Sequence, residues 1–239
     1  MWLVLSAQED PGVDALAERL RQRGLDPLIH ASPEDIGLAR WSYRTGGTVE
    51  SSEVLLPNGI NVASSCLRGV LNRLYAVPAS ALAQVERADR GYATEELLAL
   101  YTSWLYGLAC PVINRPTATG LCGPWPDRSW WVARALSAGL PVAAWRWQGV
   151  AVDTGQDSEG PDTETLLLLD GQVVEGRAPV DLLPACTRLA ERSKTRLLGL
   201  TFLVTPTAGW QFFDATPMPD LSSSGNALAD AVASALTRT

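Results

Sequence analysis

Few residues of this sequence could carry acid–base or nucleophilic chemistry. His30 is the only histidine, so paired-histidine metal sites are excluded and at most one Cys–His or Ser–His couple remains. His30 lies in an apolar run with Leu28 and Ile29, which favours a satisfied imidazole in the core or at a strand end over a catalytic base. The sequence also lacks the two common phosphate-cradling loops, a Gly-x-Gly-x-x-Gly turn after a strand and a Walker motif.

The thiols are equally sparse. The four cysteines form no Cys-x-x-Cys pair, which predicts reduced thiols and neither a zinc site nor a disulfide framework. Cys122, in the loop "GLCGP", is the thiol most worth testing. Because no base lies near it in sequence, we favour a passive loop cysteine.

One carboxylate stands in a suggestive place. The stretch "WQFFDATPMP", residues 210–219, reads as a strand that runs into a proline-stiffened loop, and Asp214 lies where the strand ends. Such an acid could be a metal ligand or the remnant of one.

Tryptophan is abundant, with nine residues. Trp125, Trp130 and Trp131 lie on a loop and the helix expected after it, and Arg134 follows Trp130 at helical spacing, where an indole and a guanidinium could stack. Tryptophan and arginine are enriched in binding hot spots, so these four residues are the predicted partner-contact set. The alternative is that the indoles pack the helix against a sheet.

Composition narrows the function classes. The formal charge of −7 and the pI of about 4.8 argue against nucleic acid and against anionic membranes as partners, because both require clustered basic side chains. The apolar run at the start is too short for a signal peptide and lacks a basic leader, and no stretch approaches the roughly 18 apolar residues of a membrane helix. We therefore expect a cytoplasmic globular protein.

The elements that must position these residues alternate between strand and helix. In the first half we expect strands at 2–6, 26–31 and 69–73, a strand ending at Asn114, helices at 11–24 and within 92–109, and a small meander between 41 and 59. The helix within 92–109 carries a broad apolar face that we expect to be buried. This order predicts an α/β fold that opens with a βαβ unit in a parallel sheet.

The second half has a different order. A helix at 128–139 and a strand at 140–147 precede a polar linker at 153–164, which has almost no apolar residue to anchor it. A hairpin around Asp170, a helix at about 184–196, a hairpin at 199–215 and a last helix at about 226–236 follow. This order indicates a compact α+β unit.

The chain resembles ATP-grasp ligases, in particular the branch that modifies ribosomal peptides. The resemblance rests on the order of "LNRLYAVP", "ADRGYATEELLALYTSWLYGL" and "CPVINRPTATGLCGPW", with an Asn-Arg-Pro turn at 114–116, and on the closing stretch 182–221. It implies an N-terminal, Rossmann-like pre-ATP-grasp βαβ domain at 1–120 and a truncated ATP-grasp-like α+β domain at 121–239.

The departures from that family pattern bear on function. The resemblance implies two lysines on a lid for the ATP phosphates, and magnesium held by an acid on one strand and a Glu-x-Asn pair on the next. Here the lid region, about 145–165, is short and has no lysine, the only lysine is Lys194 in a predicted helix, and the metal positions hold Thr201 and then Asp214 and Thr216. One carboxylate gives magnesium weak support. We therefore interpret Asp214 as a relic and expect no catalytic residue, bound metal or cofactor.

Two function classes remain. The first is a catalytically degenerate accessory or scaffold protein that binds a protein or peptide in a biosynthetic or peptide-modification pathway, as a homodimer or hetero-oligomer. The second is an ATP-dependent carboxylate–amine ligase with an altered site or one completed by a partner subunit. The missing lysines and metal ligands favour the first.

Overall fold

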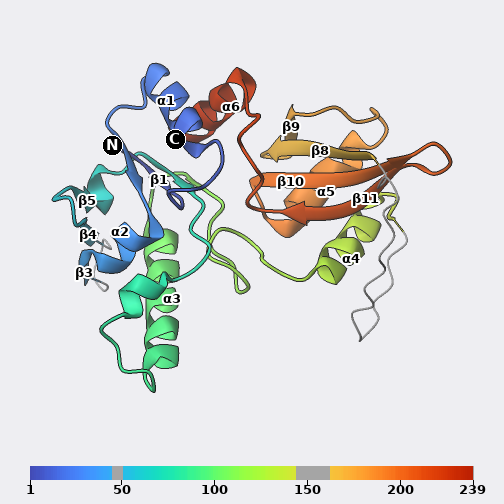
Figure 1. Cartoon of the computed structure of the whole chain (residues 1–239). Helices are drawn as coiled ribbons and strands as arrows, with labels where there is room; N and C mark the ends of the chain where they lie inside the picture. The colour runs from blue at the N-terminus through green and yellow to red at the C-terminus, as the bar shows by residue number, and fades with distance from the viewer. Residues whose placement is uncertain (45–50, 144–161, 239) are drawn as a thin grey trace.

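A computed structural model describes residues 1–44, 51–143 and 162–238, and it contains the predicted parallel sheet (Figure 1). The strand order is β2-β1-β6-β7, and every neighbouring pair runs parallel. Helix α1 connects β1 to β2, as the βαβ prediction requires. The elements are β1 (Trp2–Leu5), α1 (Val13–Gln22), β2 (Leu28–Ala31), β6 (Gly69–Asn72) and β7 (Val112–Ile113).

Helices cover both faces of this sheet. On one face α1 packs with the C-terminal helix α6 (Asn226–Thr237), and their buried side chains share a core with Trp2 and Val4. On the other face α3 (Arg90–Gly107) and a small antiparallel sheet share a second core. The small sheet comprises β3 (Arg40–Arg44), β4 (Ser51–Leu55) and β5 (Asn61–Ala63). Its first two strands fall in the meander predicted at 41–59, of which 45–50 lie outside the described residues, and β5 lies beyond that range. The short helices nearby are α2 (Pro33–Leu38), η1 (Ser64–Cys66) and η2 (Ala79–Leu82).

The prediction of a broad buried face on α3 is only partly correct. Tyr101, Trp104 and Leu105 are buried, whereas Leu97 and Leu100 are half-buried. The N-terminal part of α3 extends beyond the sheet (Figure 1), so less protein is available to cover it.

The second sheet is antiparallel, with the order β11-β10-β8-β9. Helices α4 and α5 cover one face, where their apolar side chains form a third core with those of the strands. The predicted hairpins at Asp170 and at 199–215 are both present. The elements are α4 (Arg128–Ala138), β8 (Asp162–Leu169), β9 (Gln172–Glu175), α5 (Leu183–Ser193), β10 (Leu197–Thr205) and β11 (Gly209–Thr216).

The end of α5 and the start of β8 differ from the predicted boundaries, and the strand predicted at 140–147 is only partly described. Helix α5 ends at Ser193 because Lys194 has a left-handed backbone, so this lysine lies outside the helix. The last residues of the predicted linker, 162–164, instead begin β8, since they pair with β10. Of the strand predicted at 140–147, Val142 forms a bridge to Phe212 of β11, and 144–147 lie outside the described residues, as do 153–161 of the linker.

The two sheets are joined at Asn114, the first residue of the Asn-Arg-Pro turn. Its backbone is left-handed (φ 60°), which asparagine tolerates better than most residues. Its side-chain Nδ2 donates to the backbone carbonyls of Leu197 (2.8 Å) and Pro217 (2.9 Å), and its Oδ1 accepts from the backbone N–H of Leu197 (2.9 Å). The backbone carbonyl of Asn114 accepts from the side-chain amide of Asn72 (2.7 Å). One buried side chain therefore fixes the start of β10 and the loop after β11 against the first sheet.

A buried ion pair reinforces this junction. Arg73 follows β6 and binds both carboxylate oxygens of Asp10 at 2.6 Å, and it also donates to the Pro219 carbonyl at 2.9 Å. Helix α6 also packs on the first sheet. Side chains from the second half of the chain therefore form part of a core of the first half. The division into 1–120 and 121–239 therefore stays a proposal.

Candidate functional site

Asp214 lies on the face of the second sheet opposite α4 and α5. In the β10–β11 ladder, Thr201 pairs with Asp214 and Gly199 with Thr216. The intervening pair, Leu200 and Ala215, belongs to the helix-covered core. Because successive side chains of a strand point to opposite faces, Thr201, Asp214 and Thr216 must project from the other face. The predicted metal positions thus do come together.

Their chemistry is poor for magnesium. Asp214 is half-buried and accepts a hydrogen bond from the Ala215 amide (2.8 Å), and the Thr216 hydroxyl accepts from the Met218 amide (3.1 Å). Across the described ranges, no group of three or more His, Cys, Asp or Glu side chains is placed to hold a metal. Mg²⁺ requires near-octahedral oxygen coordination and uses one or two carboxylates together with substrate phosphates. With Asp214 as the single acid beside Thr201 and Thr216, these residues supply the minimum number of carboxylates.

A small cavity of about 190 Å³ adjoins the end of β11. Trp125 and the loop around it form one wall, and the strand end from Asp214 to Pro217 forms the other. Arg128 holds the walls together: its Nε donates to the Phe213 carbonyl (2.9 Å), and its guanidinium carbon lies 3.4 Å from the centre of the Phe213 ring. Sequence reasoning missed Arg128, although its position beside "SWW" at the start of a predicted helix was a usable signal.

The predicted partner-contact residues divide into two groups. Trp125 is 51% exposed, and Trp130 is half-buried with the Arg134 guanidinium carbon 4.6 Å from its ring centre. Trp131 is only 2% exposed and lies in the core under α4, so its placement on a contact surface was wrong. The ring centres of Trp131 and Trp130 lie 4.9 Å apart, and their planes are at 89°, an edge-to-face contact. The buried Trp131 therefore packs against the more accessible Trp130.

His30 has the geometry of a satisfied strand-end imidazole. Its Nε2 lies 2.8 Å from the Ser6 hydroxyl and its Nδ1 lies 3.5 Å from a carboxylate oxygen of Asp14. The order of these groups matches a hydrolytic triad, but Ser6 is fully buried and Asp14 is 83% exposed, the reverse of what a nucleophile and an orienting acid need.

Cys122 lies in a loop, as the sequence predicts. It is buried, and this burial raises the pKa of its thiol to about 12. The thiol therefore stays protonated near neutral pH and is a weak nucleophile.

Comparison with known proteins identifies the fold. No protein-family model matches the sequence, and no curated protein matches it. Among solved structures, macrocyclase MdnC bound with precursor peptide MdnA, from Microcystis aeruginosa MRC, superposes with a TM-score of 0.75 at 9% identity over 100% of both chains. A RiPP-associated ATP-grasp ligase of Chryseobacterium gregarium, in complex with ADP and a leader and core peptide, gives 0.71 at 10% identity over 98% of this chain and 96% of that one.

A more distant match is the RimK domain protein ATP-grasp from Sphaerobacter thermophilus DSM 20745, with a TM-score of 0.55 at 15% identity over the full length of both chains. At such identities the likeness establishes architecture and not activity. The superpositions cover nearly the whole of each chain. This coverage agrees with the resemblance found in sequence, which rests on motifs near both ends of the chain. This protein has the ATP-grasp-like fold of the peptide-modifying ligases.

Proposed function

We propose that this protein is a catalytically degenerate ATP-grasp-like protein that binds a peptide or protein partner, in the cytoplasm, as an accessory or scaffold in peptide modification. One observation carries the proposal: the sheet face that holds Asp214 presents one carboxylate and two threonine hydroxyls where the family pattern places metal-binding acids and an amide. The fold supports the nature of the partner, because the solved ligases that it resembles are in complex with precursor or leader peptides.

The distribution of charge supports the loss of nucleotide chemistry. A triphosphate needs cations close to it. The sequence has one lysine, Lys194, which is exposed at the end of α5. The stretch of about 145–165, where the family places its lid, has only Arg146 as a cation, against the acids Asp153, Asp157, Glu159, Asp162 and Glu164.

The partner surface that we propose consists of Trp125, Trp130 and Arg134, extended by Arg128, and we call it the tryptophan surface. Contacts with buried groups position this surface. Trp131 packs against Trp130, and Arg128 donates a hydrogen bond to Phe213 of β11. Tryptophan and arginine are among the residue types enriched in binding hot spots.

The proposal is tested by solution mass and partner recovery, for the wild type and for Trp130→Ala. We expect the wild type to form a dimer or a complex with a partner from native extracts, and Trp130→Ala to remain folded but lose that association. Tyr92→Ala is the matched control, because Tyr92 is a 69% exposed aromatic on α3, away from the tryptophan surface. A wild-type mass near 25.6 kDa with no partner recovered would contradict the proposal.

A further inference from the structure

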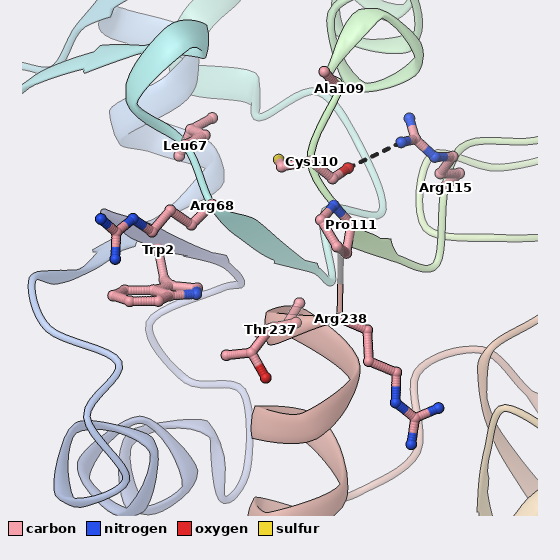
Figure 2. Close-up of a pocket in the computed structure, with 10 residues that line it drawn as sticks. Trp2, Leu67, Arg68, Ala109, Cys110, Pro111, Arg115, Thr237 and Arg238 are labelled. Carbon is pink, nitrogen blue, oxygen red and sulfur yellow. Dashed lines mark hydrogen bonds between the residues drawn. The ribbon is translucent and has the colours of Figure 1, made fainter.

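A cavity of about 890 Å³ lies at the end of the first sheet opposite the Asn114 junction (Figure 2). None of its lining residues lines the cavity beside Asp214. Trp2 begins β1, Arg68 precedes β6 and Pro111 precedes β7, so the cavity lies at the amino ends of these parallel strands. The C-terminal end of α6, including Leu236, closes another side. The Asn114 and Arg73 junction lies at the carboxyl ends of the same strands, which places the cavity away from the second sheet.

The floor of the cavity is apolar. Trp2, Leu67, Pro111 and Leu236 provide the apolar surface. Trp2 is 6% exposed, and its indole Nε1 is a buried donor without an acceptor in the part of the chain that the structure describes. Figure 2 shows this nitrogen on the side of the ring that faces Pro111 and Thr237. Since this nitrogen has almost no accessible surface, the cavity meets the indole ring and not its N–H.

The lining of the cavity is positively charged, whereas the protein as a whole is negatively charged. The chain has 26 acidic residues and a net charge of −7, yet the lining contains three arginines and no Asp or Glu. Arg115 is occupied, because its guanidinium donates to four carbonyls at the end of α3. The guanidinium groups of Arg68 and Arg238 make no hydrogen bond or ion pair with any residue in 1–44, 51–143 or 162–238.

Arg68 is already positioned. Its guanidinium carbon lies 5.3 Å from the centre of the Trp2 ring, so the planar cation is held against the indole. A guanidinium stacked in this way keeps its N–H groups in the plane available for a carboxylate.

From these observations we propose that this cavity, the Trp2 cavity, binds an organic carboxylate with an apolar body. The apolar part lies on Leu67, Pro111 and Leu236, and the carboxylate meets the Arg68 guanidinium beside the Trp2 ring. A free hydrophobic acid and the carboxyl-terminal residue of a peptide share this chemistry. The volume suits a ligand of that size, since small-molecule sites typically span about 300–1,000 Å³.

Cys110 provides a reporter in the wild-type chain. Its thiol lines the cavity, and Figure 2 shows the sulfur on the side that faces Leu67 and Trp2. Cys66 is exposed and does not line the cavity, whereas Cys122 and Cys186 are buried. The rate of iodoacetamide modification at Cys110, divided by the rate at Cys66 in the same sample, therefore measures occupancy of the cavity.

The first experiment follows this ratio by mass spectrometry with decanoate, with its uncharged counterpart decanol, and with an acetylated tripeptide that ends in leucine. We expect about 1 mM decanoate to lower the ratio at least about fivefold, and decanol to have far less effect, because decanol lacks the charge that Arg68 binds. Protection by the tripeptide and not by decanoate would identify a peptide terminus as the source. An unchanged ratio with both acids, or equal protection by decanol, would overturn the proposal.

Variants then locate the carboxylate. In calorimetric titrations with decanoate, Arg68→Gln should weaken affinity by about tenfold, the loss expected for one charge-assisted hydrogen bond. Arg87→Gln is the matched control, because Arg87 is exposed and outside the cavity. Ala109→Trp should block binding from the exposed rim without altering the core. Equal affinities for Arg68→Gln and the wild type would contradict the assignment of the carboxylate to Arg68.

Discussion

Two polar positions that the family resemblance identifies, Asn114 and Asp214, have opposite environments in the structure. Asn114 is 1% exposed, and its side-chain amide makes three hydrogen bonds that connect the two sheets. Asp214 is half-buried and accepts one hydrogen bond, from the residue that follows it. The two positions are close in the fold, because Pro217, which accepts from Asn114, lies three residues after Asp214.

The contrast distinguishes a position that the fold requires, Asn114, from positions that only metal or phosphate binding would require. A buried amide that satisfies several backbone groups cannot be replaced without a large cost, so the fold itself maintains Asn114. Thr201, Asp214 and Thr216 lie on the sheet face opposite the helix-covered core, so we expect a change of side chain there to leave that core intact. The fold can therefore remain while the metal and phosphate positions are lost, and the following variants test this difference.

The largest effect should come from Asn114→Ala. The change leaves the Leu197 amide and the carbonyls of Leu197 and Pro217 buried without partners and places alanine in a left-handed conformation. We expect a loss of about 5 kcal/mol in the free energy of unfolding, measured with urea, because each unsatisfied buried group costs about 1–3 kcal/mol. Asn61→Ala, at an exposed strand position, is the control. A loss near 1 kcal/mol for Asn114→Ala would break the comparison.

Trp131→Ala should rank second. It removes a buried indole from the core under α4, and a Trp→Ala change in a core costs about 3–5 kcal/mol. Trp125→Ala, at a 51% exposed position of the same region, should change the unfolding free energy by less than about 0.5 kcal/mol. Similar losses for the two variants, measured by thermal or urea unfolding, would show that the tryptophan surface is not organised as described.

The smallest effect should come from Asp214→Asn. The amide keeps an oxygen that can accept from the Ala215 amide, and no described cation pairs with the acid. We expect the unfolding free energy to change by less than about 0.5 kcal/mol. A gain or loss above about 2 kcal/mol would mean that the carboxylate has a partner of its own, and the interpretation of Asp214 as a relic would fail.

Much of the architecture could be predicted from sequence because it depends on local patterns. The apolar runs and turn residues located both sheets, and the resemblance placed Thr201, Asp214 and Thr216 on paired strands, where the structure has them. Contacts between distant segments could not be predicted in this way. The Asp10–Arg73 ion pair joins residues 63 positions apart, and α6 packs on a helix from the other end of the chain.

The tryptophan set illustrates the same limit. Trp130 and Trp131 are adjacent and identical in type, and helical periodicity alone did not decide which one faces the core. The Trp2 cavity was also missed, since its walls come from four segments that meet only in the folded chain.

The central claim is that the nucleotide site has been lost from an intact fold, and its most direct test is a calorimetric titration of the full chain with ATP in the presence and absence of magnesium. We predict no magnesium-dependent binding tighter than about 1 mM, because the sequence lacks the paired lysines and the metal-binding acids that hold a triphosphate in the family pattern. A micromolar, magnesium-dependent dissociation constant would contradict the account and favour an ATP-dependent ligase with an altered site.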